Sequence, residues 1–93
     1  MQNKITPKKL EKYFEITEKA LSIAKKKINK KRTGEAKEII DMVENYLSDA
    51  KYFKEKKDYI NSFAAINYAH GWLDSGSRLG IFKVKNSKLF VIK

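Results

Sequence analysis

The chain of 93 residues carries 21 Lys and Arg against 11 Asp and Glu, a net charge of +10, and it contains no cysteine. Its length supports one hydrophobic core, so we expect a single domain over residues 1–93, and the lack of thiols excludes disulfides, catalytic cysteines and sulfur-ligated metals, as expected of a cytoplasmic protein. No run of about 18 apolar residues could span a membrane, and the polar start lacks the apolar stretch of a signal peptide.

The first predicted helix covers about residues 7–29. Thr6 can accept a hydrogen bond from an unpaired amide at the helix start, and Pro7 already has the backbone angle of a first turn. Apolar positions then recur at alternating four- and three-residue steps, which predicts one buried face. The residues of this face are Leu10, Phe14, Thr17, Leu21, Ala24 and Ile28. The polar segment 29–34 ends the pattern with a glycine and predicts a chain reversal.

Two more helices are predicted over about residues 35–55 and 58–79. The second carries one apolar stripe, and the third has Asp58 as its expected N-cap and Gly80 as its expected stop. Besides a main apolar face, the third helix has a second one, made by Ala65, Tyr68, Trp72 and Leu79. Because a helix with two apolar faces needs cover on two sides, we expect Tyr68, Trp72 and Leu79 to form an interface, for example with a second copy of the chain.

The segment 81–92 alternates apolar and polar residues around an Asn-Ser pair, which predicts a β-hairpin. A two-stranded hairpin alone is marginal in water, so we expect it to pack on the third helix near Trp72 and Leu79 or to pair with another chain. Gly71 and Gly76 predict a close approach over the third helix by another helix or by this tail, or by a ligand. The expected fold is therefore mainly α: a three-helix up-down-up antiparallel bundle with a short C-terminal β-hairpin.

His70, Asp74 and Arg78 follow one another at four-residue steps, so they share one side of the third helix. Asn67 lies next to them on that helix, and Asp49 on the second helix could join across the helix pair. One interpretation is an internal network in which imidazole, carboxylate and guanidinium satisfy each other. The other is a ligand site, a weak metal site or an acid–base pair, because an Asp that orients His raises its basicity.

We favour the internal network, because buried polar groups are normally paired whatever their function. A zinc site, a di-iron site, a nucleophile elbow or a P-loop would need companion residues that the sequence does not supply. We therefore expect no enzymatic activity, no cofactor and no metal.

A basic cluster spans the C-terminal end of the first helix and the loop after it, and the charge of the chain is concentrated at its two ends. Residues 1–34 carry eleven Lys and Arg against three Glu, and residues 81–93 carry four Lys and no acid. Some of these cations complement the negative end of the helix dipole, but six within eight residues repel one another and suit a polyanion. The cluster is Lys25, Lys26, Lys27, Lys30, Lys31 and Arg32. Aromatic residues are not interleaved with it, so a stacking platform for single-stranded RNA is not expected.

The segments 49–53, 57–59, 63–66, 68–76 and 79–80 resemble an archaeal family, the domain of unknown function 357. The resemblance covers about residues 45–82 most specifically and implies an α-helical bundle from an archaeon. It supplies no activity and no catalytic residue to transfer. The second and third helices are also loosely similar to HEPN-type helical domains, but the Arg that precedes the catalytic His in those ribonucleases is missing ahead of His70.

Taken together, these features predict a non-enzymatic protein-interaction or scaffold module that binds a protein partner or forms a homodimer. The alternative is a nucleic-acid binder, RNA above all, that uses the cluster from Lys25 to Arg32.

Overall fold

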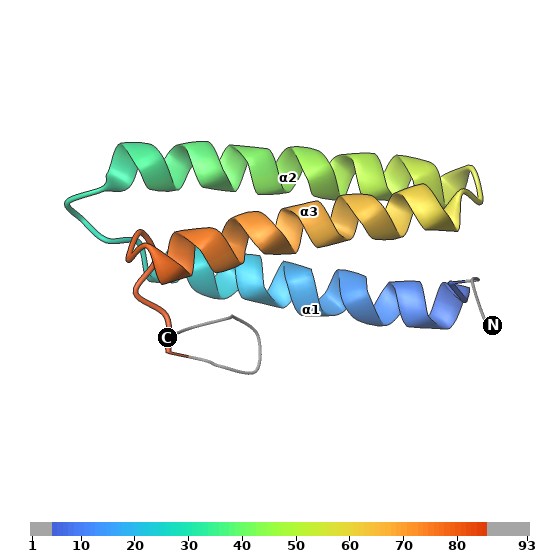
Figure 1. Ribbon diagram of the computed structural model, residues 1–93, viewed down its shortest axis with the longest axis horizontal. Helices are drawn as coiled ribbons and strands as arrows, with labels where there is room; N and C mark the ends of the chain where they lie inside the picture. Colours follow the sequence, from blue (N-terminus) through green and yellow to red (C-terminus); the bar gives the residue numbers. More distant parts are fainter. Residues whose placement is uncertain (1–4, 86–93) are drawn as a thin grey trace.

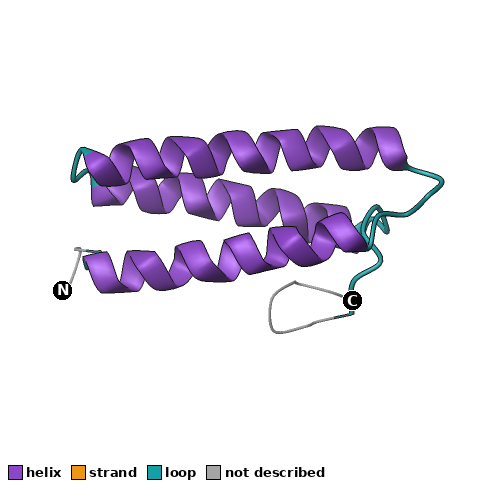
Figure 2. Cartoon of the chain, turned by 180° about the vertical axis from the view of Figure 1, so that it is seen from behind, coloured by secondary structure: helices purple, strands orange, loops and turns teal. Residues whose placement is uncertain are grey.

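The computed structural model describes residues 5–85, which form three helices and their connections. The helices are α1 (Pro7–Lys26), α2 (Thr33–Glu55) and α3 (Tyr59–Arg78). Figure 1 shows them side by side, with each helix antiparallel to the one before it, which confirms the up-down-up arrangement. Over the described residues, Figure 2 shows helices and loops and no strand.

The helix ends follow from the capping residues. Thr6 Oγ1 accepts a hydrogen bond from the Lys9 amide at 3.1 Å, and the Asp58 carboxylate accepts one from the Asn61 amide at 3.2 Å, as predicted for both N-caps. Gly80 follows α3 with φ of +77°, a backbone conformation that glycine adopts without strain.

Two helix boundaries differ from the prediction. α1 ends at Lys26, three residues early, because Ile28 leaves the helix to pair with Phe82 in an isolated antiparallel bridge. α2 begins at Thr33, two residues early, so Gly34 lies in its first turn and not in the loop.

The core lies along α3, which packs on both other helices, whereas α1 and α2 approach each other closely at few points. Small residues let the helices approach: Ala20, Ala24, Ala50 and Ala69 are fully buried. Ser62 is also fully buried, and its hydroxyl donates to the Ala50 carbonyl at 2.7 Å, so the polar atom is satisfied across the α2–α3 seam. The predicted apolar stripe of α1 is confirmed from Leu10 to Ala24.

The C-terminal β-hairpin is not supported. Residues 81–85 form no strand; instead Phe82 bridges to Ile28, and the rest of the predicted hairpin lies outside the described residues. The alternation that suggested a strand arises because Phe82 and Val84 turn inward onto the bundle while Lys83 and Lys85 face solvent. The predicted close approach holds at Gly76, where an added Cβ would lie 2.6 Å from the Phe82 ring, and not at Gly71, which has open space.

Candidate functional site

His70 lies in a groove between α1 and α3 and joins the two helices. Its Nδ1 is 3.1 Å from Thr17 Oγ1, and its Nε2 is 3.7 Å from Asp74 Oδ1. Each of the two α3 side chains is about one quarter exposed, at 23% and 24%. A carboxylate only accepts hydrogen bonds, so the arrangement that suits all three groups has the Thr17 hydroxyl donating to Nδ1 and the Nε2 proton facing Asp74.

The other members predicted for this site lie apart from that chain of contacts. Arg78 is exposed and, within residues 5–85, makes no ion pair with Asp74. Asn67 is exposed at the rim of the same groove, and Asp49 is exposed on α2 without a hydrogen bond to the others in the described part of the chain. The residue that sequence reasoning missed is Thr17; its signal was a hydroxyl inside an otherwise apolar stripe.

Hydroxyl, imidazole and carboxylate in a row are the groups of a nucleophile–base–acid triad, but the geometry does not suit catalysis. Thr17 is 2% exposed, so its hydroxyl cannot reach a substrate carbonyl. In residues 5–85 no group of three or more His, Asp or Glu side chains could hold a metal ion. The arrangement fixes α1 against α3 and leaves a groove of about 500 Å³ beside it.

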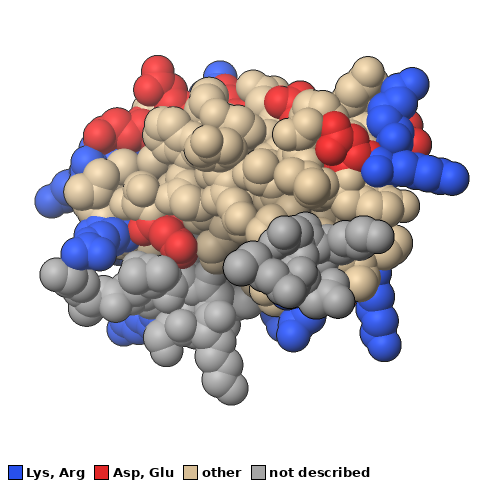
Figure 3. All heavy atoms as spheres, turned by 45° about the vertical axis from the view of Figure 1, so that its right-hand side comes forward, with Lys and Arg blue, Asp and Glu red and all other residues tan. Residues whose placement is uncertain are grey.

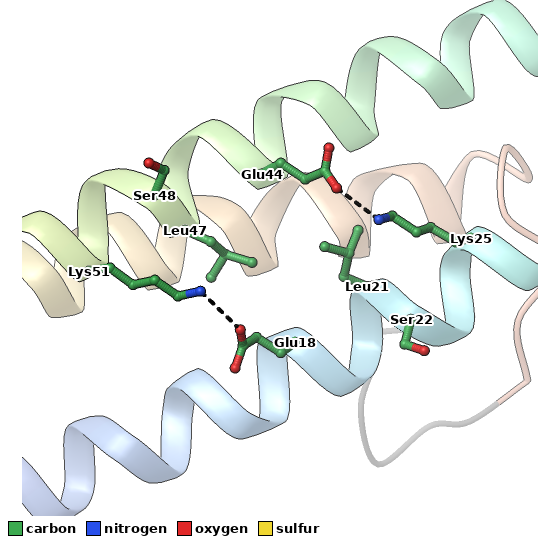
Figure 4. A pocket seen from close by; sticks show the side chains of 8 residues that line it. All are labelled: Glu18, Leu21, Ser22, Lys25, Glu44, Leu47, Ser48 and Lys51. Atoms are coloured by element: carbon green, nitrogen blue, oxygen red, sulfur yellow. Dashed lines mark hydrogen bonds and ion pairs between the residues drawn. The ribbon is translucent and has the colours of Figure 1, made fainter.

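A second groove, of about 450 Å³, separates α1 from α2 and is bridged by ion pairs (Figure 4). Lys25 pairs with Glu44 at 2.8 Å and Glu18 with Lys51 at 3.5 Å, while the side chains of the buried Leu21 and Leu47 point into the space between the helices. Glu11 pairs with Lys54 further along the same seam. The spacing of the α1 partners was visible in the sequence, because Glu11, Glu18 and Lys25 follow one another at seven-residue steps and so lie on one side of the helix.

The outward face of α2 and α3 carries three of the exposed large apolar side chains of the described residues. Tyr68, Trp72 and Leu79 are 63%, 39% and 63% exposed, and Tyr68 stacks on Tyr46 with ring centroids 5.4 Å apart. Trp72 and Leu79 border a groove of about 610 Å³. The rest of its lining is Ile39, Met42 and Ile81, with Glu35, Glu38 and Asp41. In Figure 3 the middle of the visible face is uncharged, and acidic and basic side chains stand along its upper edge.

The basic cluster is partly neutralised by ion pairs. Arg32 binds Glu35 through two parallel hydrogen bonds of 2.8 and 2.9 Å, which raise the pKa of Arg32 and lower the pKa of Glu35. The guanidinium also donates to the Leu79 carbonyl, so Arg32 ties the α1–α2 loop to the end of α3. Lys25 pairs with Glu44, which leaves Lys26, Lys27, Lys30 and Lys31 exposed and without an ion pair to any described residue.

None of the described helices is long and apolar enough to cross a membrane.

The comparisons with known proteins give one match. Searches of curated proteins and of solved structures return no match. The family described as "Protein of unknown function (DUF357)" matches residues 12–82, from the second turn of α1 to the bridge residue Phe82. Since this match covers all of the helical core except the first turn of α1, the chain belongs to the DUF357 family.

Proposed function

We propose that the protein is a non-enzymatic protein-binding module that uses the outward face of α2 and α3. The observation that carries the proposal is the exposure of Trp72, at 39%, and of Leu79, at 63%, which both line a groove of about 610 Å³. Exposed aromatic and aliphatic side chains beside a pocket are the usual anchors of a protein interface. A cysteine-free chain suits the reducing cytoplasm, and we place the module there.

The absence of an enzymatic role is part of this proposal and has its own support. The best chemical constellation, Thr17 with His70 and Asp74, has its hydroxyl buried in the helix seam. Because these side chains contact one another across two helices, they stabilise the fold and are poorly placed to act on a substrate.

The charge around the groove indicates the chemistry of the partner. Glu35 is already bound to Arg32, whereas Glu38 and Asp41 line the groove and make no ion pair within residues 5–85. An apolar segment flanked by Lys or Arg would therefore bury its apolar side chains against Trp72 and Leu79 and place its cations beside these two carboxylates. We propose such a segment of another protein as the occupant.

The single tryptophan gives a direct test of this interface. A designed amphipathic helical peptide with apolar residues at three- and four-residue steps and flanking lysines is titrated into the protein while Trp72 fluorescence is recorded. We expect a blue shift, because binding removes the indole from water. A peptide with flanking glutamates should give a much weaker shift, and Glu38→Gln/Asp41→Asn should abolish the difference between the two peptides.

Two controls test which surface binds the peptide and whether a second copy of the chain occupies that surface instead. Leu79→Ala should weaken binding of the lysine peptide, whereas Tyr52→Ala, at an exposed tyrosine outside the groove, should not. Light scattering after size exclusion measures self-association. A monomer whose fluorescence responds to neither peptide would refute the interface, and a dimer that shields Trp72 without peptide would make a second copy the occupant and overturn the proposed partner.

A second candidate function, nucleic-acid binding through the cluster from Lys25 to Arg32, is favoured by one observation. Four of the six cations, Lys26, Lys27, Lys30 and Lys31, have no ion pair with a described residue and crowd the turn after α1. Their positive charge remains available to phosphates.

A further inference from the structure

The two basic segments of the chain, far apart in sequence, meet at one end of the bundle. Figures 1 and 2 both place the α1–α2 loop beside the segment that follows α3. The Lys83 amide donates to the Lys27 carbonyl at 2.7 Å, and the Asn29 amide donates to the Ile81 carbonyl at 2.8 Å. The Asn29 side chain donates a further hydrogen bond to the Gly80 carbonyl at 3.0 Å, so two backbone hydrogen bonds and one side-chain hydrogen bond set the register of the contact.

This register puts lysine against lysine. Ile28 and Phe82 form the bridge and turn toward the core, so their neighbours Lys27 and Lys83 both face solvent. The segments 25–32 and 78–85 contain six and three cations respectively and no Asp or Glu. Like charges placed opposite each other destabilise a pairing, and acidic residues at the outward positions would have removed that cost. A polyanion bound across both segments would remove it as well.

We propose that this end of the bundle is a composite site for the phosphodiester backbone of a nucleic-acid duplex. The site joins Lys26 at the end of α1 and Lys27, Lys30 and Lys31 of the following loop to Lys83 and Lys85 of the tail. The inference rests on the second candidate function and adds to it the two tail lysines, which lie more than 50 residues from the loop lysines along the chain and join them only through the fold.

The surroundings of these lysines favour a duplex over other polyanions. Among residues 81–85, the apolar side chains Ile81, Phe82 and Val84 are all buried, so this described part of the tail presents no exposed apolar side chain to a bilayer. Both segments lack an exposed aromatic ring, which a single strand would need for base stacking. These lysines would therefore contact the phosphates of a duplex and would not read its base sequence.

Salt-dependent binding of one RNA duplex and one DNA duplex of the same sequence tests the proposal. With one phosphate contact for each of the six lysines, the affinity of the unaltered protein for the DNA duplex should fall about 1,800-fold between 50 and 200 mM salt. Lys83→Ala/Lys85→Ala removes two contacts, and the same change in salt should then lower the affinity only about 150-fold. Lys83→Arg/Lys85→Arg keeps the charge and should behave like the unaltered protein.

Lys8→Ala/Lys9→Ala is the matched control, because it removes the same charge from the first turn of α1 at the opposite end of the bundle (Figure 1). If the tail and control variants show equal affinity and equal salt slopes, the composite site is wrong while the loop cluster still binds. Failure of the unaltered protein to bind either duplex at 50 mM salt would refute the second candidate function itself. Tighter binding to phosphatidylglycerol vesicles than to both duplexes would make a membrane the ligand and overturn the proposal.

Discussion

The inward face of α3 presents Ile66 and Leu73, which are 1% and 0% exposed, whereas the outward face presents Trp72 and Leu79 at 39% and 63%. Both faces are apolar, and they lie on one helix. The inward face is covered by α1 and α2, and Phe82 of the tail packs on the surface around Gly76. Apolarity therefore identifies the surface that must be covered, whereas the topology decides whether the chain itself covers it.

The sharpest test of this difference is one substitution made on each face. Leu73→Ala should lower the free energy of unfolding by about 2–5 kcal/mol, because it opens a cavity in a fully buried site. Leu79→Ala removes the same atoms from an exposed position and should change stability by less than about 0.5 kcal/mol. Urea denaturation of both variants measures the contrast. Similar losses in the two variants would mean that the outward face is covered in solution.

The glycines of α3 offer a second matched pair, with effects of opposite sign. At Gly76 an added methyl group would lie 2.6 Å from the Phe82 ring, so Gly76→Ala should cost about 1–3 kcal/mol of overpacking against a gain of about 1 kcal/mol in helix propensity. At Gly71 the methyl group meets open space, and Gly71→Ala should raise stability by about 0.5–1 kcal/mol.

Thermal unfolding followed by circular dichroism separates these two outcomes. Phe82→Leu in the Gly76→Ala background relieves the contact and should recover part of the loss. If Gly76→Ala proved as stabilising as Gly71→Ala, the tail would not pack on α3 as the structure places it.

Much of the fold could be predicted because it depends on local patterns. Apolar spacing identified the three helices, and Thr6 and Asp58 identified two of their starts to within a residue. The tail could not be predicted in the same way, because alternation of Phe82 and Val84 with lysines fits a self-paired hairpin as well as a segment lying on a helix. The choice depends on Gly76, which leaves room for the Phe82 ring.

The candidate sites depended even more on contacts between distant residues. Helical spacing brought His70 and Asp74 together, but the contact with Thr17 spans 53 residues and follows only from how α1 packs on α3. The basic loop was visible in the sequence, whereas its pairing with Lys83 required the bridge between Ile28 and Phe82.

The smallest expected effect on stability concerns Arg32, which binds Glu35 and the Leu79 carbonyl and so holds the α1–α2 loop to the end of α3. Hydrogen bonds from Arg32 lower the pKa of Glu35 below its ordinary value of 4.5, so this carboxylate stabilises the fold above that pH and loses its contribution as the pH falls through its folded pKa. Glu35→Gln should therefore lower the stability slightly at pH 7, and the difference from the unaltered protein should shrink toward acid pH. Glu55→Gln, at an exposed carboxylate without an ion pair in residues 5–85, is the control. Urea unfolding at pH 7 and pH 3 measures both variants, and a pH-independent effect of Glu35→Gln would show that the loss comes from the changed side chain and not from its charge.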